Sequence, residues 1–193
     1  MNMKILDVGA GFYPYPGAVS IDGNAAAAPG ILHDLNAYPW PVADSTYDMV
    51  YSSHCLEHLA DPKRAVEEIW RVAKPGATVI IRVPHFSSRV AWTDIEHTRA
   101  FGIHSLRRFT PPFTQFGNNS AVFTPISTRL RWQQRVDVPL IPGWARLLLP
   151  VINIANAVIS ACANLSPEFC ERLWCYYVGG MGEVEYTLRV EKP

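Results

Sequence analysis

The four cysteines of this chain form no closely spaced pair, and its charges leave no net excess. Cys55, Cys162, Cys170 and Cys175 contain no Cys-x-x-Cys motif, so we expect no zinc site built on cysteine pairs and predict reduced thiols in a cytoplasmic protein. The start MNMKILDVG lacks the charged leader and apolar run of a secretory signal. Lysine plus arginine total 17 and aspartate plus glutamate total 17, so no nucleic-acid partner is expected.

The neutral total hides a basic middle segment. Residues 82–146 hold nine arginines against three acids, a local balance of +6, while the segments on either side are acidic. This pattern indicates an anionic substrate or surface, with a solvated basic face as the alternative. With 193 residues, 49% of them hydrophobic, we expect a single domain over 1–193 with a substantial core.

A glycine-rich turn follows an apolar strand near residues 3–8. Glycines after a strand let the backbone approach a ligand, and an acid that ends the next strand can accept hydrogen bonds from a ribose. The spacing is too short for the usual dinucleotide fingerprint, which argues against an oxidoreductase. The turn and the strand-end acid give a candidate ligand site: Asp7, Gly9, Ala10, Gly11 and Asp22.

Three further segments follow in order along the chain. They are His33-Asp34-Leu35, the stretch 47–59 (YDMVYSSHCLEHL) and the stretch 68–77 (EIWRVAKPGA). Taken with the start, residues 3 to about 110 resemble the class I S-adenosylmethionine-dependent methyltransferases. The resemblance implies an α/β, Rossmann-like fold with a mostly parallel seven-stranded sheet and helices on both faces. It also implies S-adenosyl-L-methionine as cofactor.

The resemblance assigns roles to the first two segments. Gly9 and Gly11 would approach the methionine and ribose portions of the cofactor, and Asp7 would orient the loop and the cofactor amino group. Asp22 would accept hydrogen bonds from the ribose hydroxyls. Asp34 and Leu35 would contact the adenine, the carboxylate at its amine and the apolar side chain against its ring.

The resemblance also assigns roles to residues that follow the fourth strand. Ser53 and His54 would lie at the carboxyl edge of the sheet, where ligands collect in open α/β folds. Glu57 and His58 match the LEHL motif, which in that family mainly fixes a turn. We therefore add Ser53 and His54 to the predicted cofactor site.

Regular elements can be placed by their patterns. Strands are expected near 3–8, 18–21, 47–51 and 78–83, with 123–132 and 182–190 as an antiparallel final pair. Asp61-Pro62 begins a helix that Lys74-Pro75-Gly76 ends. The ten residues before Asp22 and the link 23–30 are too short for crossover helices, so we expect a loop and then at most a turn near 25–28.

About fifty residues, 133–181, separate the last two strands as a helical insertion. A helix over 151–162 would pack through apolar positions 151, 154, 155, 158, 159 and 162. We expect the insertion, over 140–178, to cover the substrate mouth or to form a homodimer contact; the alternative is peripheral docking on a membrane through Trp144, Arg146 and 147–149. Pro142, Pro150 and three asparagines are expected to break residues 140–165 too much to span a bilayer.

Histidines after the fifth strand are the candidate catalytic groups. His97 is predicted as the base for an acceptor hydroxyl, with His85 assisting, because imidazole titrates near neutrality. A structural hydrogen-bonding role is the alternative for both residues. Asp94, His97 and His85 are a conceivable metal set, but no metal site is predicted.

The resulting functional prediction is a methyltransferase with a cofactor-binding core and substrate loop over 1–120. We expect it to act on a polar or anionic acceptor, by O-methylation of a glycan, a glycolipid precursor or a small metabolite. The alternative is a non-catalytic S-adenosylmethionine-binding or scaffold protein, whose apolar insertion mediates assembly or membrane contact.

Overall fold

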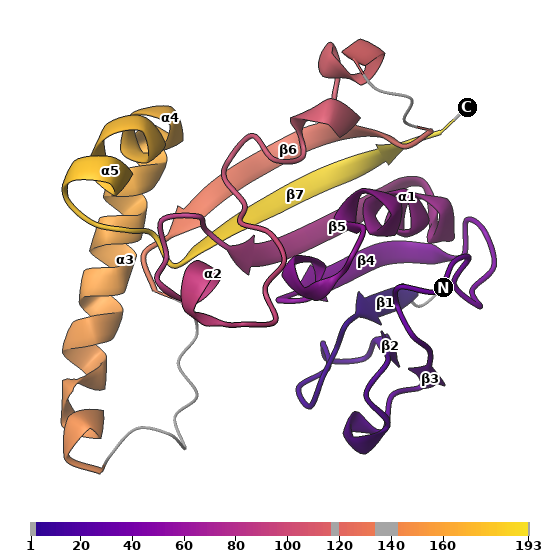
Figure 1. Ribbon diagram of the computed structural model, residues 1–193, viewed down its shortest axis with the longest axis horizontal. Coiled ribbons are helices and arrows are strands. Elements are labelled where there is room, and N and C mark those ends of the chain that lie inside the picture. Colours follow the sequence, from indigo (N-terminus) through magenta and orange to yellow (C-terminus); the bar gives the residue numbers. More distant parts are fainter. Residues whose placement is uncertain (1–2, 117–119, 134–142, 193) are drawn as a thin grey trace.

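The computed structural model describes residues 3–116, 120–133 and 143–192, whose strands form one seven-stranded sheet (Figure 1). The strand order is β3-β2-β1-β4-β5-β7-β6. Neighbours are parallel from β3 to β5, whereas β7 is antiparallel to both β5 and β6, which confirms the predicted fold class. The strands are β1 (Ile5–Val8), β2 (Val19–Asp22), β3 (Ile31–Leu32), β4 (Tyr47–Ser53), β5 (Ala73–Pro84), β6 (Val122–Arg131) and β7 (Glu183–Glu191).

The connection between β1 and β2 contains no helix, and the structure describes all of it. Pro14 and Pro16 oppose a helix there, as predicted from the spacing. The link from β2 to β3 holds one 3-10 turn, Ala25–Ala27, where the Ala26 amide donates to the side chain of Asn24 at 3.0 Å. Loop amides and side chains therefore form the carboxyl edge of β1 and β2.

Helix α1 (Pro62–Val72) joins β4 to β5 and covers one face of the sheet (Figure 1). Its start is fixed by Asp61, whose side chain accepts a hydrogen bond from the Arg64 amide at 3.0 Å. The helix buries its apolar face and leaves Lys63 and Arg64 exposed, while Glu68 is buried and pairs with Arg71. It ends at Val72, two residues earlier than the predicted Lys74-Pro75-Gly76 stop, because β5 begins directly at Ala73.

The chain between β6 and β7 forms the predicted helical insertion, of which residues 134–142 lie outside the described part of the chain. In Figure 1 it stands at the end of the sheet where β5 terminates, near the short helix α2 (Val90–Thr93). Its elements are a 3-10 turn (Gly143–Leu148), α3 (Leu149–Leu165), α4 (Pro167–Phe169), a π-helical turn (Cys170–Trp174) and α5 (Cys175–Tyr177).

Helix α3 packs against the sheet through polar side chains. The Asn164 side chain accepts from the Leu130 amide at 2.9 Å and donates to the Leu130 carbonyl at 2.7 Å. The Ser160 hydroxyl accepts from the Trp132 amide at 3.0 Å, and Asn156, one turn earlier, accepts from the next amide along the chain. These backbone groups lie at the end of the edge strand β6, so the helix supplies hydrogen bonds that a further strand would otherwise make.

Several apolar side chains of α3 face outward, although Ala163 is buried in the core. Val151, Ile154 and Val158 are 64%, 66% and 55% exposed, so this face is free for the predicted cover, dimer or membrane contact, which stays a prediction. Ile159, by contrast, is partly buried against the core. The reason is that the edge of β6 offers backbone donors and acceptors, which attract the Asn and Ser stripe.

The helix is also more continuous than expected. Pro150 lies in its first turn, where proline is tolerated, so the prediction that the segment is too broken is wrong for 149–165. The stretch Arg146–Leu165 is long and apolar enough to cross a membrane by length and composition, and only 6% of it is buried.

Candidate functional site

The turn after β1 passes close to the chain that follows β4. Gly9 has φ +71°, and a Cβ at this position would collide with the Cβ and Sγ of Cys55. Its amide donates to the Ile21 carbonyl at 2.9 Å, which ties the turn to β2. Gly11 also has positive φ, and among the described residues no atom lies within 4 Å of a Cβ built on it. The turn is thus closed on the Cys55 side and open at Gly11, with Ala10 between them.

Two predicted acids hold this turn in place. Asp22, at the end of β2, accepts from the Gly11 amide at 2.7 Å and from the Asn24 amide at 2.8 Å, one bond to each carboxylate oxygen. Asp7 is buried and accepts from the Tyr15 amide at 2.7 Å. Burial, with a smaller contribution from nearby Asp22, raises the pKa of Asp7 to about 6. Asp7 therefore holds the β1–β2 connection in place through the Tyr15 amide.

Of the two residues predicted to contact the adenine, one is exposed and the other is buried. Asp34 is exposed and accepts from the Asn36 amide at 2.9 Å. Leu35 is 6% exposed and packs in the core, and its carbonyl accepts from the Trp40 indole at 3.1 Å. Leu35 therefore shapes the turn from inside, and it leaves little side-chain surface for a ligand.

His54 gives the carboxyl edge of β4 a positive charge. It follows Ser53, has φ +54°, and places Nε2 at 2.7 Å from a Glu183 oxygen and Nδ1 at 3.2 Å from a Glu57 oxygen. Burial alone would lower the pKa of His54, but the carboxylates of Glu183 and Glu57 outweigh it and raise the pKa to about 9. The imidazole is therefore cationic at neutral pH. Glu183, at the start of β7, was not foreseen, because 129 residues separate it from His54.

These groups fit the portions of S-adenosylmethionine. The open side of Gly11 allows close approach to the backbone, and each Asp22 oxygen keeps a lone pair for a ribose hydroxyl. The His54 cation suits a carboxylate at the end of β4. Gly9, Gly11, Asp22 and His54 would therefore hold the cofactor at the carboxyl edge of the sheet, where open α/β folds bind ligands.

The two predicted catalytic histidines have different neighbours. His85 is fully buried; its Nδ1 lies 2.7 Å from the Ser87 hydroxyl and its Nε2 lies 3.1 Å from a Glu171 oxygen. Glu171 comes from the insertion and also accepts from the Ile103 amide, and the His85 hydrogen bond helps to lower its pKa against the effect of burial. His85 thus ties β5 to the insertion.

His97 lies beside the turn that follows β4. Its ring packs edge-on against His58 with centroids 4.7 Å apart, and its Nε2 is 3.7 Å from an Asp94 oxygen. Only 4% of the His97 side chain is exposed. Its role as a base stays a prediction, and no contact joins it to His85 among the described residues.

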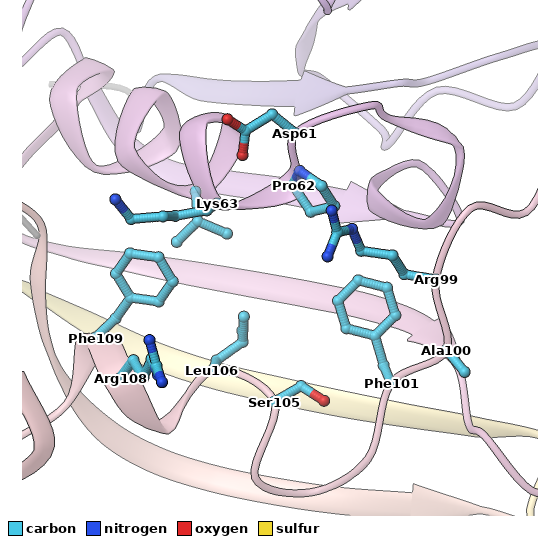
Figure 2. A pocket seen from close by; sticks show the side chains of 11 residues that line it. Asp61, Pro62, Lys63, Arg99, Ala100, Phe101, Ser105, Leu106, Arg108 and Phe109 are labelled. Carbon is cyan, nitrogen blue, oxygen red and sulfur yellow. The ribbon is translucent and has the colours of Figure 1, made fainter. Parts of the chain in front are cut away.

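A cleft of about 690 Å³ opens between the start of α1 and residues 99–109 (Figure 2). In Figure 2, Lys63, Arg99 and Arg108 extend around it and Asp61 is the only acid among the lining residues. None of the predicted cofactor-site residues lines this cleft. It is lined by Asp61, Pro62, Lys63, Val66, Arg99, Ala100, Phe101, Ser105, Leu106, Arg108 and Phe109.

Comparisons with known proteins agree with this architecture. Residues 14–81 match the family model of a methyltransferase domain. Ajmaline N-methyltransferase from Rauvolfia serpentina is 39% identical over 71 residues, which cover 34% of this chain and 24% of that enzyme. The chain thus matches about a quarter of the length of this curated relative.

Solved structures share the fold at low sequence identity. A SAM-dependent methyltransferase from Archaeoglobus fulgidus superposes with a TM-score of 0.59 at 15% identity, over 97% of this chain and 86% of that one. Phosphoethanolamine N-methyltransferase 2 of Haemonchus contortus, in complex with S-adenosyl-L-methionine, gives 0.58 at 13% identity, over 100% and 49%. The family model over residues 14–81, the matched curated sequence and the fold are thus all similar to those of the S-adenosylmethionine-dependent methyltransferases.

Proposed function

We propose that this chain transfers the methyl group of S-adenosylmethionine to a hydroxyl oxygen of a polar or anionic acceptor, and that the acceptor is a glycolipid precursor. The observation that carries the proposal is the basic cleft between the start of α1 and residues 99–109. Lys63, Arg99 and Arg108 surround it, which suits a phosphate or carboxylate. A free glycan or a small metabolite would be a simpler acceptor of the same polar or anionic class.

A chain of contacts links the cofactor edge to the cleft. Gly9 lies against Cys55, two residues before Glu57. The carbonyl of Glu57 accepts from the Thr98 amide at 2.7 Å and from the Thr98 hydroxyl at 3.0 Å. Arg99, the next residue, lines the cleft. The acceptor and the cofactor would therefore bind on either side of the turn that follows β4.

Methyl transfer requires alignment and, for a hydroxyl, removal of a proton. Bound cofactor supplies an electrophilic methyl group on its sulfonium. The protein would fix the donor through Gly11, Asp22 and His54, and the acceptor through the cationic side chains of the cleft. His97, on the same segment as Arg99, is the predicted base; His85 would assist by holding the following segment to β5 and to Glu171.

We further propose that α3 rests on a membrane surface, which places the protein peripherally on the cytoplasmic side. No charged residue occurs from Leu147 to Leu165, and the outward side chains are apolar. The segment after α3 adds exposed aromatic residues, Trp174, Tyr176 and Tyr177. Apolar side chains bordered by Trp and Tyr are typical of helices in the interfacial layer of a bilayer.

The position of α3 connects this surface to the reaction. Asn164 binds Leu130 of β6, Leu130 pairs with Val184 of β7, and Val184 pairs with Val83 near the end of β5. The helix therefore stands at the carboxyl edge of the sheet, as Figure 1 shows. An acceptor with its lipid part in the bilayer would present its polar head on the side of the sheet where the cofactor is expected.

Vesicle binding tests the membrane contact. We expect the protein to cosediment with anionic phospholipid vesicles, and the double variant Ile154→Asp, Val158→Asp to lose this binding while it keeps cofactor affinity. Ile126→Asp, at an exposed apolar position of β6, is the control. A dimer in solution that the double variant converts to a monomer, without vesicle binding by the natural chain, would contradict the membrane contact and assign α3 to self-association.

Release of S-adenosylhomocysteine tests the activity. Free sugars, nucleotide sugars and polyprenyl-phosphate-linked sugars are offered as acceptors, the last in vesicles. We expect turnover with hydroxylated acceptors and the fastest turnover with the lipid-linked sugar. Cofactor binding without turnover on any of them would contradict the proposal and favour a non-catalytic cofactor-binding protein.

A further inference from the structure

We propose that Glu57, His58 and His97 form a binding site for one divalent transition-metal ion of the zinc class. One ligand atom of each residue lies within 4.8 Å of the other two. Two imidazoles and one carboxylate are a set that binds Zn²⁺ and leaves a coordination position open. Tetrahedral zinc lies about 2.0–2.1 Å from each ligand, which places the ligand atoms about 3.3 Å apart. On binding, the three ligand atoms would therefore move closer together than in this structure, by rotation of their side chains.

The strongest sign of a missing partner is at Glu57. The residue is fully buried, yet neither of its carboxylate oxygens has a hydrogen-bond partner among the described residues. Its contact with His54 has ion-pair distance but lacks hydrogen-bond geometry. A buried carboxylate without hydrogen bonds is costly. Nδ1 of His97 is buried and unpaired in the same described part of the chain. A metal cation bound between the Glu57 carboxylate and Nδ1 of His97 would give both groups a partner.

The backbone already holds the two segments together. Thr98 donates its amide and its hydroxyl to the Glu57 carbonyl, and its hydroxyl also lies 3.0 Å from the Leu59 carbonyl. These bonds fix the residue after His97 to the turn that carries Glu57 and His58. Metal ligands placed on segments fixed in this way lose little conformational entropy on binding.

The surroundings are suited to a dication. An Asp94 oxygen lies 3.7 Å from Nε2 of His97. A metal bound to Nδ1 would leave this Nε2 free, and carboxylates commonly orient metal-bound histidines through the nitrogen that the metal does not use. Glu57 within the cluster and Asp94 beside His97 contribute two negative charges, and two neutral imidazoles add none. The balance of −2 matches the charge of the ion.

The proposal changes the task of His97. An imidazole nitrogen bound to a metal cannot also accept a proton from the acceptor, so a metal at this site would replace the predicted base role of His97 with that of a ligand. Metal binding does not depend on the proposed methyl transfer, and it is measured without any substrate.

The experiment titrates the chelator-treated full chain with Zn²⁺ in a calorimeter and counts bound zinc by elemental analysis. We expect one ion per chain, and at least about 100-fold weaker binding by His97→Ala and His58→Ala, since even residues that only support metal ligands contribute about 10- to 100-fold. His104→Ala is the matched control, because His104 is half exposed and pairs with Glu168 outside the cluster. Glu57→Gln, which keeps the side-chain shape, should weaken binding similarly.

Cobalt distinguishes this site from the cysteines. With Co²⁺ in place of Zn²⁺, the absorption should lack the intense thiolate charge-transfer band that cysteine ligands produce. Absence of stoichiometric zinc, equal zinc binding by His97→Ala and His104→Ala, or a thiolate spectrum would each overturn the proposal. Unchanged S-adenosylhomocysteine affinity in His97→Ala shows that the variant is folded, and His97→Gln repeats the test if the alanine variant is unstable.

Discussion

Helices α1 and α3 contact the same sheet with opposite kinds of side chain. Helix α1 buries Ala65, Val66 and Ile69 and exposes Lys63 and Arg64. Helix α3 directs its Asn and Ser stripe to the end of β6 and exposes Ile154 and its apolar neighbours. Apart from Asn153, the outer face of this uncharged helix carries mainly apolar side chains. The contrast supports the proposed contact of α3 with an apolar surface.

Matched substitutions on the two helices should give the largest difference in stability. Ile69→Ala on α1 should lower the free energy of unfolding by about 2–5 kcal/mol, because it leaves a cavity in the core. Ile154→Ala on α3 should change it by less than about 0.5 kcal/mol, since that side chain is 66% exposed. Denaturant unfolding of both variants measures the difference.

Equal losses in the two variants would contradict the comparison. They would mean that Ile154 is buried in solution, by self-association or by a different helix orientation, and a repeat at several protein concentrations separates these explanations.

The polar stripe of α3 should matter more for stability than its apolar face. Asn164→Ala should cost about 2–3 kcal/mol of unfolding free energy, because the amide and carbonyl of the buried Leu130 lose their partners. Asn153→Ala, on an exposed position of the same helix, is the control and should be nearly neutral. The same denaturant series measures both, and a neutral Asn164→Ala would disprove the inward orientation of the stripe.

The contact of the insertion with β5 should depend on pH. Hydrogen bonds to His85 and to the Ile103 amide lower the pKa of Glu171 despite the opposing effect of burial. A carboxyl with a lowered folded-state pKa contributes stability above its unfolded pKa and loses that contribution as pH falls through the folded value. Glu171→Gln should therefore destabilise the protein by about 1 kcal/mol at pH 7 and have little effect well below pH 4.5.

Glu168→Gln serves as the control for this titration, because the Glu168 side chain is 52% exposed and pairs at the surface with His104 and Arg172. Its effect should be smaller at every pH. An effect of Glu171→Gln that persists unchanged in acid would argue against an ionised Glu171 at the contact.

Local signals in the sequence predicted the cofactor half of the molecule. The turn at Gly9 and Gly11, the strand that ends in Asp22 and the Asp61-Pro62 helix start each depend on residues close together in the chain, and each is found where it was predicted. The short first crossovers followed from counting residues, since too few lie between β1 and β2 for a helix.

Contacts between distant segments could not be predicted in this way. The pairing of His54 with Glu183 depends on the register of β7 against β5, and that of His85 with Glu171 depends on how the insertion folds back. The spacing of apolar residues identified the apolar face of α3, but not the partner of its polar face. The hydrogen bonds from the Asn and Ser stripe to the backbone at the end of β6 appear only in the three-dimensional arrangement.

Calorimetric titration with S-adenosylhomocysteine tests the central claim, a cofactor site at the carboxyl edge of β1, β2 and β4. The natural chain should bind it, and NAD should not compete. Asp22→Ala should weaken binding by roughly 10- to 100-fold, because it removes charged hydrogen-bond acceptors worth about 1.5–3 kcal/mol, while Glu67→Gln on α1 should bind normally. Equal binding by the natural chain and Asp22→Ala, or displacement by NAD, would contradict the assignment.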